Sequence, residues 1–263
     1  MEKALFYIYT VAKNSMGQKK KVIFQMVNHV VFLLFSLYLY RHVYEILPHV
    51  GAKLPFSNAI WSMSIYFVMF WLALNRIERT FRDDIKSGNI EMYLLRPLDY
   101  IWQKVFIQIG LGLFPFLFAL VLSVTIDYFL VGLPNMDMPI LLWILATIII
   151  FITSQTLMCL MFVLCGLSGF WIDNSEPVFF IVSKFIMVLG GAWVPVAFFP
   201  KALQLFAEYS PFGAAMAVTY TMYPNFGEHF FVLLLNILFW TALCGGAVLT
   251  VSKRALKKLA VNG

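Results

Sequence analysis

Long apolar runs alternate with short polar segments along the whole chain. A helix needs about 20 residues to cross the ~30 Å hydrocarbon layer of a membrane. Six runs approach or exceed that length: residues 22–46, 58–74, 101–131, 139–164, 177–194 and 230–251. The pattern therefore predicts an all-α integral membrane protein, with six transmembrane helices in a single domain that covers residues 1–263.

Prolines modify two of the six predicted spans. The third run is too long to lie wholly in hydrocarbon, and Pro115 inside it predicts a kink. The fifth run begins at Pro177, and proline is favoured in the first turn of a helix because no backbone N–H is needed there.

The N-terminal residues 1–21 precede the first span and have a helical pattern of their own. Leu5, Ile8, Val11 and Ala12 recur at helical spacing, and three lysines follow at positions 19–21. This combination predicts an interfacial helix that lies on the cytoplasmic leaflet, with a frayed tail as the alternative.

Residues 195–228 are strongly apolar although they contain several prolines. Pro200 is placed to start a short amphipathic helix, which Ser210 and Pro211 would end. A segment this apolar is not expected to be a solvated loop. We expect an outer, re-entrant segment that dips into the bundle or caps it, since buried non-helical backbone is tolerated where protein shields it.

The composition agrees with a membrane protein. Hydrophobic residues make up 62% of the 263 residues and the mean hydropathy is +0.84, whereas soluble domains are roughly 45–50% apolar. One globular core cannot bury this excess. The net charge of +6 is then explained by basic cytoplasmic loops, and no nucleic-acid partner is expected.

Lysine and arginine positions predict the orientation of the spans. With six spans, 15 of the 19 basic residues fall on one side, in the N-terminal segment, the loop after the second span and the C-terminal tail. Only Arg41, Lys53 and Lys201 fall on the other side. The positive-inside rule places both termini in the cytoplasm, as in a multi-pass protein of the cytoplasmic membrane.

Residues 75–100, here called the hairpin, carry an unusual share of the charge. Eleven of the chain's 32 charged residues lie between Asn75 and Lys104. Ile77, Phe81 and Ile85 recur every fourth residue, so the helix of the second span is expected to run on with its charges on the other faces. Gly88 should end that helix by adopting left-handed backbone angles.

A second short helix is predicted between Gly88 and Pro97. Asn89 suits its N-cap and Glu91 its first turn, while Asp99 can cap the third span. Its apolar face consists of Ile90, Tyr93, Leu94 and Leu95. This face would lie on lipid headgroups or fit a groove of a partner protein, and a merely solvated charged loop is the alternative.

The segment "DDIKSGNIEMYLLRPLDYIW" resembles the cytoplasmic loop of ABC type-2 exporter permeases. The matching positions are Asp84, Ile85, Gly88, Ile90, Leu94, Leu95, Arg96, Pro97 and Leu98. The outer segment is also similar to this family, in its spacing of prolines around a short helix, and the resemblance extends over nearly the whole chain.

The resemblance implies the membrane subunit of an ATP-driven exporter. Such a subunit pairs with a second permease, identical or homologous, and with two ATPase subunits on separate chains that bind the ATP and Mg²⁺. An amphiphilic or drug-like substrate would be exported. The coupling helix that docks on the ATPase would comprise Gly88, Asn89, Ile90, Glu91, Tyr93, Leu94, Leu95 and Arg96.

The chain carries no sign of catalysis of its own. It has no GxxxxGK[ST] phosphate loop, so no nucleotide or other cofactor is expected on this chain. The predicted spans hold no paired acids, no HExxH and no serine–histidine site, which argues against a membrane enzyme. His42, Glu45 and His49 share a helix face, but Pro48 interrupts it, and no metal site is predicted. A membrane scaffold protein without transport activity is the main alternative.

Four polar side chains inside the predicted spans are candidates for a substrate path. They are Asp127, Gln155, Lys184 and Asn236. The alternative for each is a local role, because polar side chains also join helices within membranes, and Lys184 is near enough to the interface to reach water.

Overall fold

The computed structural model describes residues 2–262, apart from residues 18, 48–50, 52, 73, 89, 91–98 and 173, and describes only the backbone of residues 2–5, 16, 19, 75 and 256–262. The helices are α1 (Glu2–Met16), α2 (Lys19–Ile46), α4 (Phe56–Phe70), α5 (Ile77–Ser87), α7 (Tyr100–Leu130), α8 (Ile140–Ser168), α9 (Glu176–Leu189), α10 (Lys201–Tyr209), α11 (Pro211–Ala214) and α12 (Phe226–Asn262). Three 3₁₀ turns cover Leu74–Arg76, Val196–Phe198 and Ala217–Met222. The described part of the chain contains no strand, which confirms the all-α prediction.

Four helices are long and apolar enough to cross a membrane, judged by length and composition. They comprise Lys20–Ile46, Tyr100–Leu130, Ile140–Ser168 and Phe226–Ala255. The predicted second and fifth spans form shorter helices, since α4 has 15 residues and α9 has 14. At 1.5 Å per residue these helices extend roughly 20–23 Å. Six full-length spans are therefore not found among the described residues, and the six-span topology stays a prediction.

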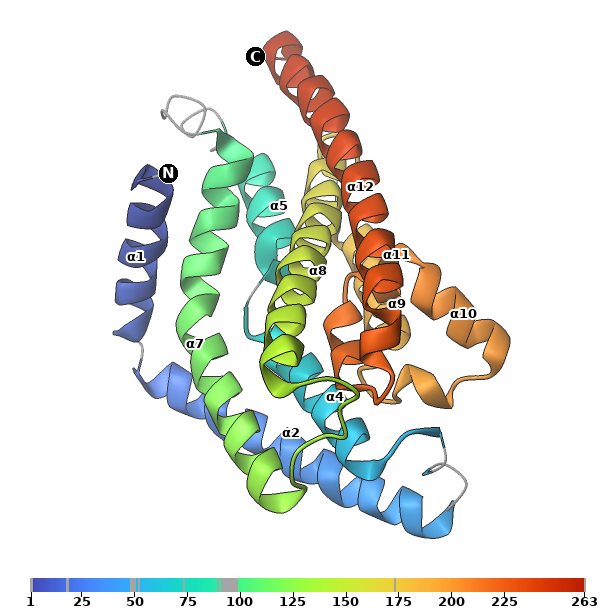
Figure 1. The fold of residues 1–263 in the computed structure, drawn as a ribbon. Coiled ribbons are helices and arrows are strands. Elements are labelled where there is room, and N and C mark those ends of the chain that lie inside the picture. The colour runs from blue at the N-terminus through green and yellow to red at the C-terminus, as the bar shows by residue number, and fades with distance from the viewer. Residues whose placement is uncertain are drawn as a thin grey trace.

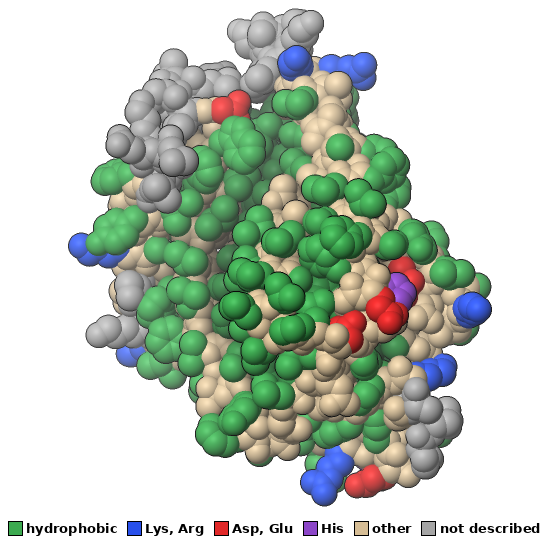
Figure 2. All heavy atoms as spheres, in the orientation of Figure 1, with side chains coloured by type: hydrophobic (Ala, Val, Ile, Leu, Met, Phe, Trp, Pro, Cys, Tyr) green, Lys and Arg blue, Asp and Glu red, His purple; other side chains and the backbone are tan. Residues whose placement is uncertain are grey.

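The long helices stand side by side, and both ends of the chain lie towards the same end of the molecule (Figure 1). The axes of α7, α8 and α12 are roughly aligned, although α7 runs in the opposite direction to the other two (Figure 1). α2 runs obliquely across the end of the bundle where α4 begins (Figure 1). The start of α1, the end of α5 and the end of α12 all lie at the opposite end (Figure 1). On the face of the molecule drawn in Figure 2, most of the side chains coloured by type are hydrophobic, as expected of a surface that contacts lipid.

The predicted N-terminal helix is present as α1, but its direction differs from the expectation. It follows the axis of α7 rather than crossing it (Figure 1). Gly110 of α7 explains the close packing, because a Cβ atom there would lie 2.9 Å from the Ile8 carbonyl oxygen and from the Val11 Cβ. Gln103 also donates a hydrogen bond to the Tyr7 hydroxyl at 3.3 Å. An interfacial location of α1 stays a prediction.

The outer segment packs into the bundle. α10 begins after Pro200 and ends before Ser210, as predicted. The following turn, Ala217–Met222, is buried at every residue and contacts α4 and α8. Two side chains donate hydrogen bonds to backbone carbonyl groups of this turn. Asn58 donates to the Met222 carbonyl at 2.6 Å, and the Trp143 indole donates to the Thr221 carbonyl at 2.7 Å. These bonds help to explain how a segment without α-helical hydrogen bonding can be buried.

Candidate functional site

α4 and α5 are separated by a break, so the prediction that one helix continues through both is wrong. α4 ends at Phe70, and the turn Leu74–Arg76 precedes α5. At the break, the Trp71 indole donates to His29 Nδ1 at 3.0 Å, and His29 Nε2 lies 2.8 Å from the Ser123 hydroxyl oxygen. An indole N–H can only donate, so the neutral imidazole carries its proton on Nε2 and donates it to Ser123. Side chains from α2 and α7 therefore hold the break.

The backbone of α7 also lies directly against the break. A Cβ atom on Gly112 would lie 2.1 Å from the Leu72 carbonyl oxygen and 2.3 Å from its carbon. Only a glycine fits such an approach between two backbones. The position of α7 is thus tied to the geometry of the α4–α5 break.

α5 buries its predicted apolar face. Ile77 and Phe81 are fully buried and Ile85 is partly buried. The Phe81 ring lies 5.0 Å from the Tyr100 ring, centroid to centroid. On the other side it packs on Gly166 of α8, where a Cβ atom would come within 2.8 Å of the Phe81 Cβ. α5 is thus packed closely between α7 and α8.

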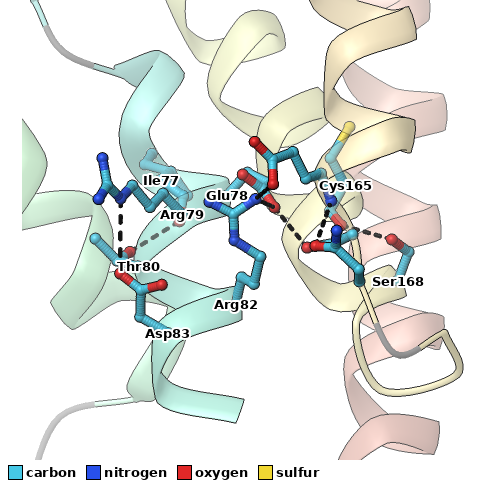
Figure 3. A network of polar contacts seen from close by, with 11 residues as sticks. Ile77, Glu78, Arg79, Thr80, Arg82, Asp83, Cys165 and Ser168 are labelled. Carbon is cyan, nitrogen blue, oxygen red and sulfur yellow. Dashed lines mark hydrogen bonds and ion pairs between the residues drawn. The ribbon is translucent and has the colours of Figure 1, made fainter. Parts of the chain in front are cut away.

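Two acidic side chains of α5 are buried, although the sequence placed the charges of this helix only on faces other than its apolar one. Glu78 is 1% exposed and accepts a hydrogen bond of 2.5 Å from the Ser175 hydroxyl, which precedes α9. Arg82 lies 3.7 Å from Glu78 and forms an ion pair of 2.9 Å with Glu176 of α9. In Figure 3, Glu78 and Arg82 point from α5 towards the side of α8 that carries Cys165. The four-residue spacing of Glu78 and Arg82 was the only sequence signal for this cluster.

The second buried acid, Asp84, connects α5 to α7. The Tyr100 hydroxyl donates a hydrogen bond of 2.8 Å to the Asp84 carboxylate, and Lys104 forms an ion pair with the same oxygen. Lys104 is 5% exposed, although the sequence pattern suggested a basic loop residue. Charged groups this deeply buried need such partners to offset their lost hydration.

The structure describes only two residues of the predicted coupling helix. Gly88 has a φ of +70° and ends α5, as predicted. Ile90 is 2% exposed and belongs to the hydrophobic core, so its side chain is turned inwards. The others, Asn89, Glu91, Tyr93, Leu94, Leu95 and Arg96, lie outside the described residues. Asp99 caps α7 as predicted, accepting from the backbone N–H groups of Ile101 and Trp102.

Two of the four intramembrane candidates are buried and incompletely bonded. Asp127 is 1% exposed, and its Oδ2 atom has no hydrogen-bond partner among the described residues. Neither side-chain polar atom of Gln155 finds a partner within the same part of the chain. Unpaired buried polar groups are uncommon in native proteins, so both residues remain candidates for a substrate path.

The other two candidates have local contacts. Asn236 donates to the Glu208 backbone carbonyl at 2.8 Å and so joins α12 to α10. Lys184 is exposed, with its ammonium 5.2 Å from the centre of the Phe180 ring. Across the described residues, no hydrogen bond or ion pair joins any two of the four candidates. The structure does not assemble them into one site.

The comparison with protein families decides the class of this helical membrane protein. A family model described as "ABC-2 family transporter protein" matches residues 26–263. The chain belongs to the ABC-2 transporter family. No curated protein matches it significantly. Members of the ABC-2 family are membrane subunits of ABC transporters that work with ATPase partners. The ABC-2 match includes every element from α4 to α12, so the resemblance stated from the hairpin motif is confirmed.

Proposed function

We propose that this chain is the permease subunit of an ATP-driven exporter and that the hairpin receives the force from the ATPase. An amphiphilic or drug-like substrate would leave across the cytoplasmic membrane. Two ATPase subunits on separate chains would bind ATP and Mg²⁺, and a second permease, identical or homologous, would complete the path. The observation that carries this proposal is the anchoring of α5 by buried contacts on several sides.

The contacts of α5 are of the kind that resist separation. Glu78 accepts a hydrogen bond from Ser175 beside α9, and Asp84 forms a buried ion pair with Lys104 of α7. Removing one partner from a buried ion pair typically costs about 3–5 kcal/mol. A displacement of α5 by a bound ATPase is therefore expected to pull α7 and α9 along rather than to break these contacts.

The arrangement of the chain ends supports the proposed orientation. The start of α1, the end of α5 and the end of α12 share one end of the molecule (Figure 1). Lys86 in the last turn of α5 and Lys253 and Arg254 in α12 belong to these segments, whereas Lys13 is in the last turn of α1 and Lys20 and Lys21 are in the first turn of α2. We assign this end to the cytoplasm, where an ATPase can reach the hairpin.

The docking assignment is tested by Leu94→Asp. Leu94 belongs to the proposed contact face, and a carboxylate there should abolish co-purification of the partner ATPase while membrane insertion is kept. Ser87→Asp is the matched control, because it adds the same charge at an exposed position on the end of α5. If the ATPase still co-purifies with the Leu94→Asp variant, the docking assignment is wrong. If the wild-type chain binds no ATPase at all, the scaffold alternative is favoured.

A further inference from the structure

A pocket separate from the hairpin opens between α10, α12 and the turn Ala217–Met222. Its volume is about 320 Å³, which is within the range of sites for small molecules or single lipid headgroups. Asn236, one of the predicted polar candidates, lies in its wall. The Asn236 amide is engaged with the Glu208 backbone, so it fixes the two walls relative to each other.

Tyr220 lines this pocket and carries a buried hydroxyl group without a described hydrogen-bond partner. The side chain is 5% exposed and lines the pocket, yet its hydroxyl has no hydrogen-bond partner among the described residues. Burial raises the pKa of Tyr220 well above its ordinary value, so the group keeps its proton and can donate. A buried donor without an acceptor is unfavourable. A ligand with an anionic or carbonyl oxygen would satisfy it.

The pocket is lined by charges of both signs. Glu208 contributes a carboxylate, which the Gln204 amide holds at 3.3 Å, and Lys53 and Lys201 line the same pocket with exposed side chains. Figure 2 shows side chains of both signs gathered on the side of the molecule where α10 meets α12. A purely anionic or purely cationic ligand would leave one of these groups opposed by a like charge.

Aromatic and aliphatic side chains complete the pocket. The rings of Tyr220 and Tyr223 pack at 5.3 Å, and both line the pocket. Aromatic faces beside a carboxylate attract ammonium groups. Leu205 and Val232, which are 49% and 47% exposed, extend the wall to the outer surface of the helices. An acyl chain can leave the pocket along them.

We infer that this pocket binds a zwitterionic lipid. Its ammonium group lies against Glu208 and the tyrosine rings, and its phosphate oxygens accept from Tyr220 and attract Lys201. Its acyl chains follow Leu205 and Val232. The inference concerns this chain alone and does not depend on ATPase docking at the hairpin.

Native mass spectrometry of the full chain in maltoside micelles tests the inference. The micelles receive equal amounts of a phosphatidylethanolamine, a phosphatidylglycerol and a trimethylammonium-propane lipid, all with identical acyl chains. The wild-type protein should retain the ethanolamine lipid in preference to both others. Equal retention of the three lipids, or a preference for either singly charged lipid, overturns the inference.

Substitutions test whether the retained lipid binds in this pocket or elsewhere on the surface of the protein. Tyr220→Phe removes only the hydroxyl and should lower retention of the ethanolamine lipid about fivefold, the effect of roughly one hydrogen bond. Tyr38→Phe is the control, because Tyr38 is an exposed residue of α2 outside the pocket. Glu208→Gln should shift the preference towards the anionic lipid. If Tyr220→Phe behaves like Tyr38→Phe, the pocket is not the binding site, even where Glu208→Gln prevents folding.

Discussion

Replacing Gly112 by alanine probes the contact between α7 and the α4–α5 break. The added Cβ atom would lie 2.1 Å from the Leu72 carbonyl oxygen, whereas real Cβ atoms essentially never come within 3.0 Å of another group. One backbone must therefore move by about 0.9 Å, which is the difference between the two distances. Backbone atoms cannot rotate away as a flexible side chain could.

The expected destabilisation follows from two opposing effects. Alanine in a helix is more favourable than glycine by about 0.5–1 kcal/mol. Overpacking of this kind typically costs about 1–3 kcal/mol, and more where backbone is displaced. Because backbone is displaced here, the cost lies in the upper part of this range, and after the gain from alanine is subtracted the Gly112→Ala protein should lose about 1–2.5 kcal/mol of unfolding free energy. For a chain of this size that lowers Tm by roughly 2–4 °C per kcal/mol.

Thermal unfolding of the purified protein in detergent, followed by size-exclusion chromatography, measures this loss. Gly246→Ala is the matched control, since Gly246 also lies within a long helix and a Cβ there has nothing within 4 Å. The control should be as stable as the wild type or slightly more stable. Equal stability of the two variants would show that α7 does not approach Leu72 as described.

Two further substitutions examine the polar contacts on either side of α5. Ser175→Ala should destabilise the protein by about 1.5–3 kcal/mol, because buried Glu78 loses a hydrogen bond to its charged group. Ser183→Ala in α9, which removes only a bond within its own helix, should have little effect in the same thermal assay. Trp71→Phe should cost about 1–3 kcal/mol because it leaves the buried His29 Nδ1 without its donor. Stability equal to that of Trp102→Phe, which alters an exposed ring, would contradict this role.

Local sequence signals predicted the ends of several elements correctly. Gly88 ends α5 with a left-handed backbone, Asp99 caps α7, and Pro200 begins α10. Each signal acts within about four residues of the position it determines, through a backbone angle or a single capping bond. Such rules need no knowledge of the rest of the fold.

The hydrophobic pattern was less reliable where tertiary contacts decide the outcome. The hydrophobic pattern predicted one continuous helix over residues 58–87. The helix instead ends at Phe70, because Trp71 and Leu72 pack against α2 and α7. The sequence also gave no indication of which residues would form hydrogen bonds with the buried acidic side chains of α5. Glu78 and Ser175 are separated by 97 residues, and no local pattern indicates that such a pair will meet. The burial of Glu78 and Asp84 could not be predicted for this reason.

The break between α4 and α5 changes how a force on the hairpin would be transmitted. A continuous helix would carry the displacement to the far end of α4, where Asn58 donates hydrogen bonds to the backbone carbonyls of Asn135 and of Met222 in the outer segment. With a break, α5 can tilt while α4 stays in place, provided that the contact of Leu72 with α7 is kept. The Glu78–Ser175 contact then passes the tilt to α9. We therefore expect the proposed transport step to begin with a joint movement of α5, α9 and the start of α7, which Asp84 joins to α5, against a stationary α4, rather than with a rigid rotation of the whole bundle.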